Sequence, residues 1–188
     1  MEAIFKKEII LNKTLCRMIG VLAFVILTTL GAFVRIPLPF SPVPITLQTF
    51  FVLLSGALLG SNLGAAVQLS YILLGLSGLP IFTGVGTGLF YLFGPTGGYL
   101  FGFVLATFFI GRYIKYSRDN LFFILGILCI ADFIILACGV TWLKFLLGIP
   151  LAKLLFIGFI PFIPGDLLKA LIASVLYLKL KSRMEEIL

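Results

Sequence analysis

Long apolar runs dominate this chain, and six of them are about long enough to cross a membrane as a helix. The apolar core of a bilayer is about 30 Å thick, and roughly 20 apolar helical residues span it. The six runs lie at about residues 18 to 34, 45 to 61, 63 to 79, 97 to 114, 120 to 143 and 165 to 180. The pattern therefore predicts an all-α polytopic membrane protein with six transmembrane helices.

The segments between the runs carry residues that break helices. Residues 35–44, RIPLPFSPVP, hold four prolines, which favour extended backbone and exclude helix. Residues 60–62, GSN, predict a tight turn between two helices of a hairpin. Residues 78–99 are rich in glycine, and residues 112–120 are charged. Residues 144–164 are apolar but interrupted by glycine and proline, which predicts either a kinked extension of the last helix or a re-entrant piece.

Composition supports a membrane protein and excludes a soluble domain. Hydrophobic residues make up 61% of the 188 residues and charged residues only 11%, and the mean hydropathy is +1.23. Six spans with short connections use nearly the whole length, so we expect one membrane-embedded domain over residues 1–188. The first run ends without a small-residue cleavage site, so we interpret it as a retained span and not as a signal peptide.

The basic residues predict the orientation of the six spans. If both termini face the cytoplasm, only Arg35, Lys144 and Lys153 lie outside, and Lys169 lies within the membrane. Ten of the fourteen basic residues then lie inside: Lys6, Lys7, Lys13, Arg17, Arg112, Lys115, Arg118, Lys179, Lys181 and Arg183. Basic residues near span ends are retained on the cytoplasmic side, so this count favours both termini inside. The net charge of +7 then reflects topology and contact with anionic lipid, and no nucleic-acid partner is expected.

Asp166 and Lys169 are the candidate binding residues, because they lie three positions apart in an apolar helix. This spacing places them on one helical face, about 20 Å from Lys179 at the cytoplasmic end. The preceding Pro164 and Gly165 predict a helix break that leaves free amide groups beside the acid. Charges within a span are costly and face a partner or a polar cavity. The pair therefore predicts a site for a polar head group, the alternatives being an isolated salt bridge or a helix cap.

The glycine-rich segment is a second candidate region. Gly84 and Gly86 alternate with other residues in a pattern that fits no dinucleotide or nucleotide phosphate-binding motif. Such glycines let backbone approach a ligand closely, with Phe82 and Tyr99 as walls of the pocket, whereas simple loop flexibility explains them equally well.

Other polar and small residues are open to more than one interpretation. Asp132, in the fifth run, could pair with Lys144, Lys169 or a polar group of a neighbouring helix, belong to a proton path, or serve only helix packing. Gln48, Gln68 and Trp142 are more typical of packing or interface positions than of ligand contacts. Gly20 and Ala23 give the first helix a small-residue face for internal packing or for docking a partner subunit.

Metal and disulfide chemistry are not expected. The chain has no histidine, which excludes a Cys/His metal site, and no cofactor motif occurs. Cys129 and Cys138 are nine residues apart in one helical run, about 13 Å, which is too far for a disulfide.

Four stretches of this sequence resemble the BioY family, the biotin-specific S components of energy-coupling-factor (ECF) transporters. They are IPLPFSPVPITLQTF, LLGLSGLPIFTGVGTG, GPTGGYLFGF and FIPGDLLKA, in this order along nearly the whole chain. The resemblance implies a six-helix subunit of a bacterial cell membrane that binds biotin from outside and works with a transmembrane coupling subunit and two ATP-binding subunits.

The resemblance also implies roles for particular residues. Asp166 and Lys169 match the acid and base that hold the ureido head group of biotin, and Tyr99 with the glycines of residues 78–99 would line the same pocket. Some members carry Arg and Asn where this chain has Leu100 and Gly86, so the biotin carboxylate needs another cation, for which we expect Arg35.

Two other functions are compatible with parts of the sequence. A stand-alone carrier could use Asp132 and Asp166 as a proton path. An enzyme would need more than one isolated acid-base pair, and the chain offers no histidine.

Overall fold

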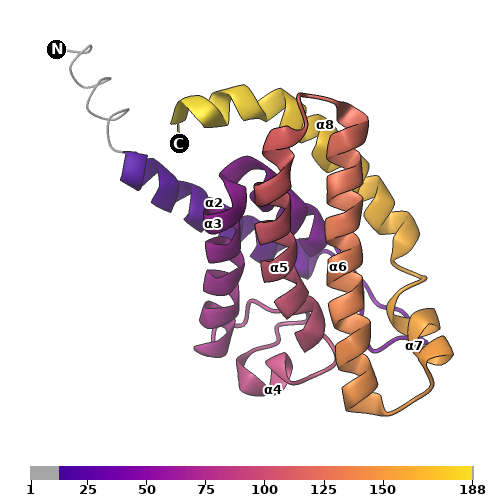
Figure 1. The fold of residues 1–188 in the computed structure, drawn as a ribbon. Helices are drawn as coiled ribbons and strands as arrows, with labels where there is room; N and C mark the ends of the chain where they lie inside the picture. The colour runs from indigo at the N-terminus through magenta and orange to yellow at the C-terminus, as the bar shows by residue number, and fades with distance from the viewer. Residues whose placement is uncertain (1–12, 188) are drawn as a thin grey trace.

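The computed structural model describes residues 13–187, which fold almost entirely into helices (Figure 1). In chain order the elements are α2 (Lys13–Phe33), β1 (Arg35–Ile36), β2 (Ile45–Thr46), α3 (Gln48–Leu76), α4 (Gly88–Leu92), α5 (Gly97–Tyr113), η1 (Ile114–Tyr116), α6 (Leu121–Leu147), α7 (Leu151–Gly158) and α8 (Ile163–Ile187). The all-α class is confirmed. Lys6 and Lys7, which contribute to the predicted orientation, lie outside the described residues.

Within residues 13–187, four helices are long and apolar enough to cross a membrane: α2, α3, α5 with η1, and α6. The pair α7 and α8 forms a fifth candidate, bent by 48°. These four or five candidate spans are fewer than the six predicted runs, because the single element α3 contains two of those runs.

α3 is a hairpin of two helices joined at Gly60. The φ of +80° and ψ of −177° at Gly60 are non-helical and are readily adopted only by glycine. Across this break, Gln68 Nε2 donates to Ser55 Oγ at 3.1 Å, although these residues are 13 positions apart, or about 20 Å in a straight helix. The halves, residues 48–59 and 61–76, are therefore antiparallel. The hairpin turn predicted at residues 60–62 is confirmed.

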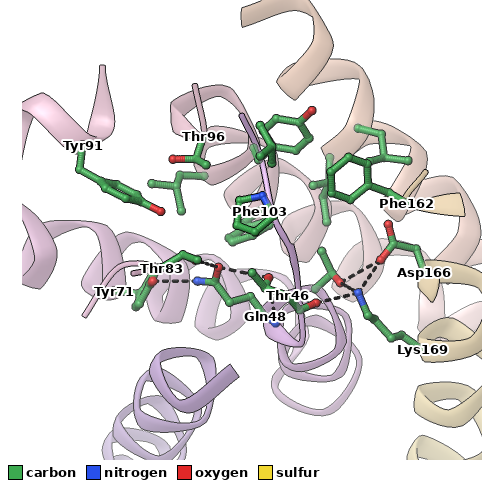
Figure 2. A pocket seen from close by; sticks show the side chains of 17 residues that line it. Thr46, Gln48, Tyr71, Thr83, Tyr91, Thr96, Phe103, Phe162, Asp166 and Lys169 are labelled. Carbon is green, nitrogen blue, oxygen red and sulfur yellow. Dashed lines mark hydrogen bonds and ion pairs between the residues drawn. The ribbon is translucent and has the colours of Figure 1, made fainter. Parts of the chain in front are cut away.

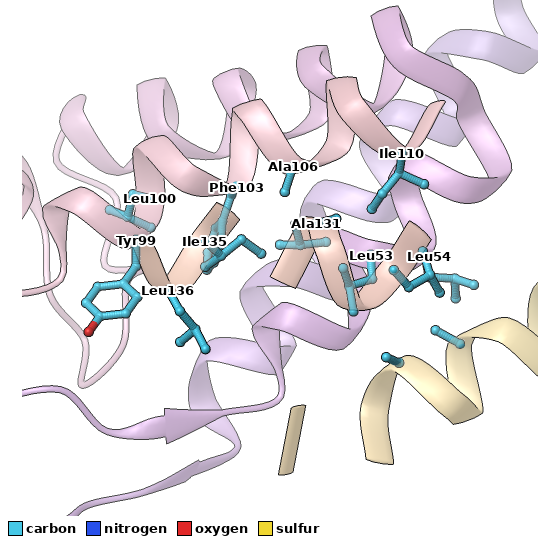
Figure 3. Packing of buried hydrophobic residues seen from close by; sticks show 14 of the residues in the cluster. Leu53, Leu54, Tyr99, Leu100, Phe103, Ala106, Ile110, Ala131, Ile135 and Leu136 are labelled. Atoms are coloured by element: carbon cyan, nitrogen blue, oxygen red, sulfur yellow. The ribbon is translucent and has the colours of Figure 1, made fainter. Parts of the chain in front are cut away.

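Small residues let this hairpin and α5 pack closely. A Cβ at Gly56 would lie 2.9 Å from Thr107 Cα, and one at Gly111 would lie 1.9 Å from Ser61 N, so neither position has room for a larger residue. The apolar layer beside this contact, shown in Figure 3, comes from α3, α5 and α6 and includes Leu53, Leu54, Phe103, Ala106, Ile110, Ala131, Ile135 and Leu136.

Figure 1 shows that α4 and α7 lie at the end of the bundle opposite to the described termini. α4 and α7 lie in the lower part of the view, whereas α2 begins and α8 ends at the upper left. The proline-rich residues 34–47 contain only the two-residue strands, paired antiparallel with Arg35 opposite Thr46 and Ile36 opposite Ile45. The predicted extended character of this segment is confirmed.

The helix ends follow local sequence. α6 begins after Asn120, whose side-chain oxygen accepts from the amides of Phe122 (2.9 Å) and Phe123 (3.2 Å). It ends at Leu147 and is followed by Gly148, which has a left-handed φ of +64°. Cys129 and Cys138 on this helix are free thiols, as their spacing predicts.

The start of α8 corrects one prediction. α8 begins at Ile163, so the predicted break lies before Pro164 and Gly165 and not at them, and the amide of Asp166 itself donates to Phe162 O at 2.9 Å. The reason is that Pro164 falls in the first turn, where a helix does not need its missing N–H. The preceding apolar segment is a separate short helix, α7, followed by a turn at residues 159–162.

Candidate functional site

The predicted pair of Asp166 and Lys169 is formed on α8. Lys169 Nζ lies 2.7 Å from Asp166 Oδ1, and the side chains are 12% and 2% exposed. The ammonium also donates to Thr46 O at 2.7 Å and to Thr49 Oγ1 at 2.9 Å. Thr46 lies on β2 and Thr49 at the start of α3, and Figure 2 shows Thr46 beside Lys169 and Asp166. All three ammonium hydrogens therefore have an acceptor, which offsets the cost of burying the charge.

The two carboxylate oxygens of Asp166 have different surroundings. Oδ1 accepts from Lys169 Nζ and from Thr49 Oγ1, the latter at 3.1 Å. Oδ2 is buried and has no hydrogen-bond partner within the described chain. A carboxylate offers about two acceptor positions on each oxygen, so Oδ2 is available to donors from outside the pair. A buried acceptor of this kind is costly unless something binds it.

Asp166 and Lys169 face a cavity enclosed by residues from several helices and from the two connecting segments. Its lining is mostly apolar and aromatic, with a few converging polar groups: Val43, Pro44, Thr46, Gln48, Thr49, Tyr71, Thr83, Tyr91, Thr96, Tyr99, Leu100, Phe103, Ile135, Leu136, Phe162, Asp166 and Lys169. Such a lining suits a compact ligand that has an apolar body and a hydrogen-bonding head.

Gln48 is the centre of a second polar group in this cavity (Figure 2). Its Nε2 donates to Tyr71 Oη at 2.7 Å, and its Oε1 accepts from Thr83 Oγ1 at 3.0 Å. Tyr71 Oη in turn donates to Ile81 O at 3.0 Å. These bonds join both halves of α3 to the glycine-rich segment. Sequence pattern alone favours a packing role for Gln48 and gives no signal for Thr49. The available signal is their place inside the stretch IPLPFSPVPITLQTF, which resembles a binding family.

Tyr99 lines the cavity from α5, in the place predicted for it. Its hydroxyl donates to Gly158 O at 2.7 Å and so connects α5 to the end of α7. The Tyr99 ring packs directly on Gly139 of α6, where a Cβ would lie 2.3 Å from the ring and would displace it.

Phe82 is fully buried but lies behind the cavity wall. Its ring stacks on Tyr91, with centroids 4.7 Å apart, and meets Tyr71 edge-on at 5.4 Å. Both tyrosines line the cavity and Phe82 does not. The structure therefore places Phe82 as a support for two wall residues.

The predicted glycines shape the same wall through their backbone. Gly86 O accepts from Phe82 N at 3.1 Å, and a Cβ at Gly86 would lie 2.1 Å from the ring of Tyr91. Gly84 has a φ of +75°, and a Cβ there would lie 2.5 Å from the guanidinium of Arg35. Neither glycine lines the main cavity itself.

Arg35 lies outside the main cavity, next to its wall. It lines an adjoining pocket with Pro42, Pro44, Thr83, Phe90, Tyr91, Gly94, Pro95 and Thr96. Pro44, Thr83, Tyr91 and Thr96 line both spaces. An extended ligand reaching past these shared residues would bring a terminal group toward Arg35.

The remaining predicted residues lie elsewhere. Asp132, on α6, is 7% exposed and makes no ion pair in the described chain; it lines a second cavity together with Asp166. On α2, Gly20 is half-buried with Leu59 3.2 Å from its Cβ position, whereas Ala23 is exposed. The structure thus brings together Asp166, Lys169 and Tyr99 and leaves the α2 residues apart from them.

The fold and this cavity together define a class of protein. A bundle of apolar helices that encloses a mostly apolar cavity with a buried acid-base pair is typical of a multi-pass membrane protein that binds a small solute. Comparison with known proteins then gives the family: the BioY family model matches residues 6–186, and the chain belongs to this family.

Individual relatives agree over most of their length. A biotin transporter BioY of Thermotoga maritima is 41% identical over 159 residues, covering 84% of this chain and 91% of the relative. A biotin transporter BioY of Lactococcus lactis is 35% identical over 181 residues, with coverage of 91% and 92%. A crystal structure of the S component for biotin from an ECF-type ABC transporter superimposes with a TM-score of 0.86 at 30% identity, covering 92% of this chain and 94% of that one.

Proposed function

We propose that this protein is the biotin-binding S component of an ECF transporter. The observation that carries the proposal is the buried Asp166 carboxylate, held by Lys169, with its free Oδ2 in an apolar cavity. The ureido ring of biotin has two N–H donors and one carbonyl acceptor in a compact apolar bicycle. A buried acceptor beside a buried cation matches this set of groups.

The contacts of the pair define how the head group would bind. One ureido N–H donates to Asp166 Oδ2, which has no partner to lose. The ureido carbonyl accepts from Lys169 Nζ, which exchanges one of its three present acceptors for the ligand. Thr49 is the acceptor most easily exchanged, because its hydroxyl still donates to Asp166 Oδ1 after it loses the bond from Lys169. Tyr99 and Phe103 pack against the ring system.

Arg35 is proposed to bind the valerate carboxylate. It lines the pocket that adjoins the main cavity through Thr83 and Tyr91, so a chain extending from the head group passes between them. A guanidinium binds a carboxylate through two parallel hydrogen bonds. Gly84, which leaves room for this guanidinium, and Gly86, which leaves room for Tyr91, contribute indirectly.

We propose six crossings with both termini in the cytoplasm of a bacterial cell. The hairpin at Gly60 supports this number, because it divides α3 into two antiparallel passes beside α2, α5, α6 and α8. The described termini lie at one end of the bundle and α4 and α7 at the other (Figure 1), which agrees with an external binding site. Labelling of single cysteines from either side of the membrane tests the orientation.

The proposed partners are a transmembrane coupling subunit and two ATP-binding subunits. The solved S component that this chain resembles comes from an ECF-type ABC transporter, and this chain itself carries no nucleotide phosphate-binding motif. The exposed face of α2 around Ala23 is the proposed docking surface, and Gly20 fixes that helix against Leu59. A stand-alone carrier would instead take up biotin in cells without any coupling subunit, and a protonophore would abolish that uptake.

Titration of purified protein with biotin is the direct test. We expect saturable binding, weakened at least tenfold, about 1.4 kcal/mol, by Asp166→Asn and by Lys169→Ala. Absence of saturable binding by folded wild-type protein would refute the proposed function. Unchanged affinity in both variants would instead leave the pair as a structural salt bridge.

A further inference from the structure

A second cavity lies between α6 and α8. Its lining is apolar except for two carboxyl groups and one thiol: Cys129, Asp132, Phe133, Leu136, Phe159, Ile163, Asp166, Leu167 and Ala170. Asp166 lines both this cavity and the main one. The carboxyl of Asp132 thus reaches the binding site through Asp166 and not directly.

Each of the two acids has one buried oxygen without a partner. These atoms are Asp132 Oδ1 and Asp166 Oδ2, and the residues are only 7% and 2% exposed. The two side chains line the same cavity between α6 and α8. Two ionised carboxylates are both acceptors, so they cannot bond to each other, and their like charges repel. A single proton between them converts two unsatisfied acceptors into one hydrogen bond.

The charges around Asp132 and Asp166 also indicate that these two acids share one proton. Lys169 is the one Lys or Arg of the described chain that lines either cavity, and its three hydrogens are taken by Thr46, Thr49 and Asp166. Two carboxylates and one ammonium would leave a buried net negative charge with no donor for Asp132. Asp166 Oδ1 already accepts from the ammonium of Lys169 at 2.7 Å and from the hydroxyl of Thr49 at 3.1 Å, whereas Asp132 has no such donors in the described chain, so the proton belongs to Asp132.

We infer that Asp132 is a positioning residue of the binding site: it is a neutral carboxylic acid whose O–H donates a hydrogen bond to Asp166 Oδ2 and so fixes the rotamer of Asp166. This inference rests on the proposed function. The two acceptor positions on Oδ2 then serve different donors. Asp132 occupies one from the cavity between α6 and α8, and the ligand N–H occupies the other from the main cavity.

Replacing Asp132 by residues with and without a donor tests this role. Asp132→Asn keeps an N–H donor of the same size, and we expect biotin affinity within about threefold of wild type. Asp132→Leu keeps the volume without a donor, and we expect a loss of at least tenfold, about 1.4 kcal/mol. Phe133→Leu, which alters the same cavity without a carboxyl, is the matched control and should bind like wild type. A loss with Asp132→Asn as large as with Asp132→Leu would overturn the inference.

Infrared spectroscopy of the ligand-free protein tests the proton itself. At neutral pH we expect a carbonyl stretch of a protonated carboxyl group in the wild-type protein that disappears in Asp132→Asn. Identical spectra in this region would overturn the inference even if Asp132→Leu fails to fold. The measurement needs no biotin, so it separates a failure of this inference from a failure of the proposed function, which only the wild-type titration decides.

Discussion

Lys169→Met separates the contribution of the buried ion pair to stability from its contribution to binding. Methionine has a similar length and volume but no charge and no donor. The substitution removes three hydrogen bonds of 2.7 to 2.9 Å, to Thr46 O, Thr49 Oγ1 and Asp166 Oδ1. It leaves the Asp166 carboxylate 2% exposed with no cation beside it.

The expected loss of stability is large for a single substitution. Removing one partner of a buried pair costs about 3 to 5 kcal/mol because the other charge stays buried. Lys169 is 12% exposed, and Asp166 keeps its bond from Thr49, so we expect the lower end, about 3 kcal/mol. For a chain of this length, that corresponds to a fall in Tm of about 6 to 12 °C. Adding Asp166→Asn removes the isolated charge and should restore about half of the loss.

Thermal unfolding in detergent, followed by tryptophan fluorescence, measures both effects. Trp142 is the single tryptophan, and its indole N–H donates to Gly94 O at 2.9 Å, so its signal reports on the region around the cavity. Lys153→Met, at an exposed lysine, is the matched control and should change stability by less than about 0.5 kcal/mol. A loss below about 1 kcal/mol for Lys169→Met, or a double variant no more stable than the single one, would refute the reasoning. Neither variant should bind biotin tightly, whatever its stability.

Three further substitutions test other parts of the structure. Gly60→Ala should destabilise the fold by about 1 to 3 kcal/mol because alanine is strained at this φ and ψ. Its control, Gly126→Ala, lies in open helical surroundings and should be neutral or stabilising by up to about 1 kcal/mol. Equal melting temperatures of the two variants would contradict the hairpin. Gly139→Ala should displace the ring of Tyr99, reducing stability by about 1 to 3 kcal/mol and weakening biotin binding; unchanged titration and melting curves would disprove the close contact. Arg35→Ala should weaken binding of biotin but not of biotinamide, which has no carboxylate; equal losses for both ligands would exclude the proposed carboxylate contact.

Local rules were sufficient for much of the fold. The GSN sequence at residues 60–62 predicts the hairpin because glycine and asparagine permit a sharp turn between two apolar runs, and Gly60 forms that break. The spacing of Asp166 and Lys169 predicts one helical face, and their atoms lie 2.7 Å apart. Both predictions depend only on backbone geometry over a few residues.

Other features depend on contacts between distant segments, which no local rule supplies. Gln48 and Thr49 begin an apolar run, yet their partners Tyr71 and Asp166 are 23 and 117 positions away. The glycine-rich segment predicts that Phe82 lies near the site. Only the stacking of Tyr91 on its ring shows that Phe82 lies behind the cavity wall. The amide of Asp166 is bonded because the helix begins three residues earlier than its Pro-Gly sequence indicates.

The shortness of the α3 hairpin has a consequence for the surrounding bilayer. Residues 48–59 and 61–76 are about 18 and 24 Å long as helices, whereas the 27 residues of α6 reach about 40 Å. Neither half of α3 matches a hydrocarbon layer of about 30 Å. At the tip of the hairpin, a recess is lined by polar groups that include Arg17, Ser61, Asn62 and Lys115. We expect lipid head groups and water to enter this recess. The hydrophobic mismatch would then thin the membrane on the side of the protein where the hairpin lies.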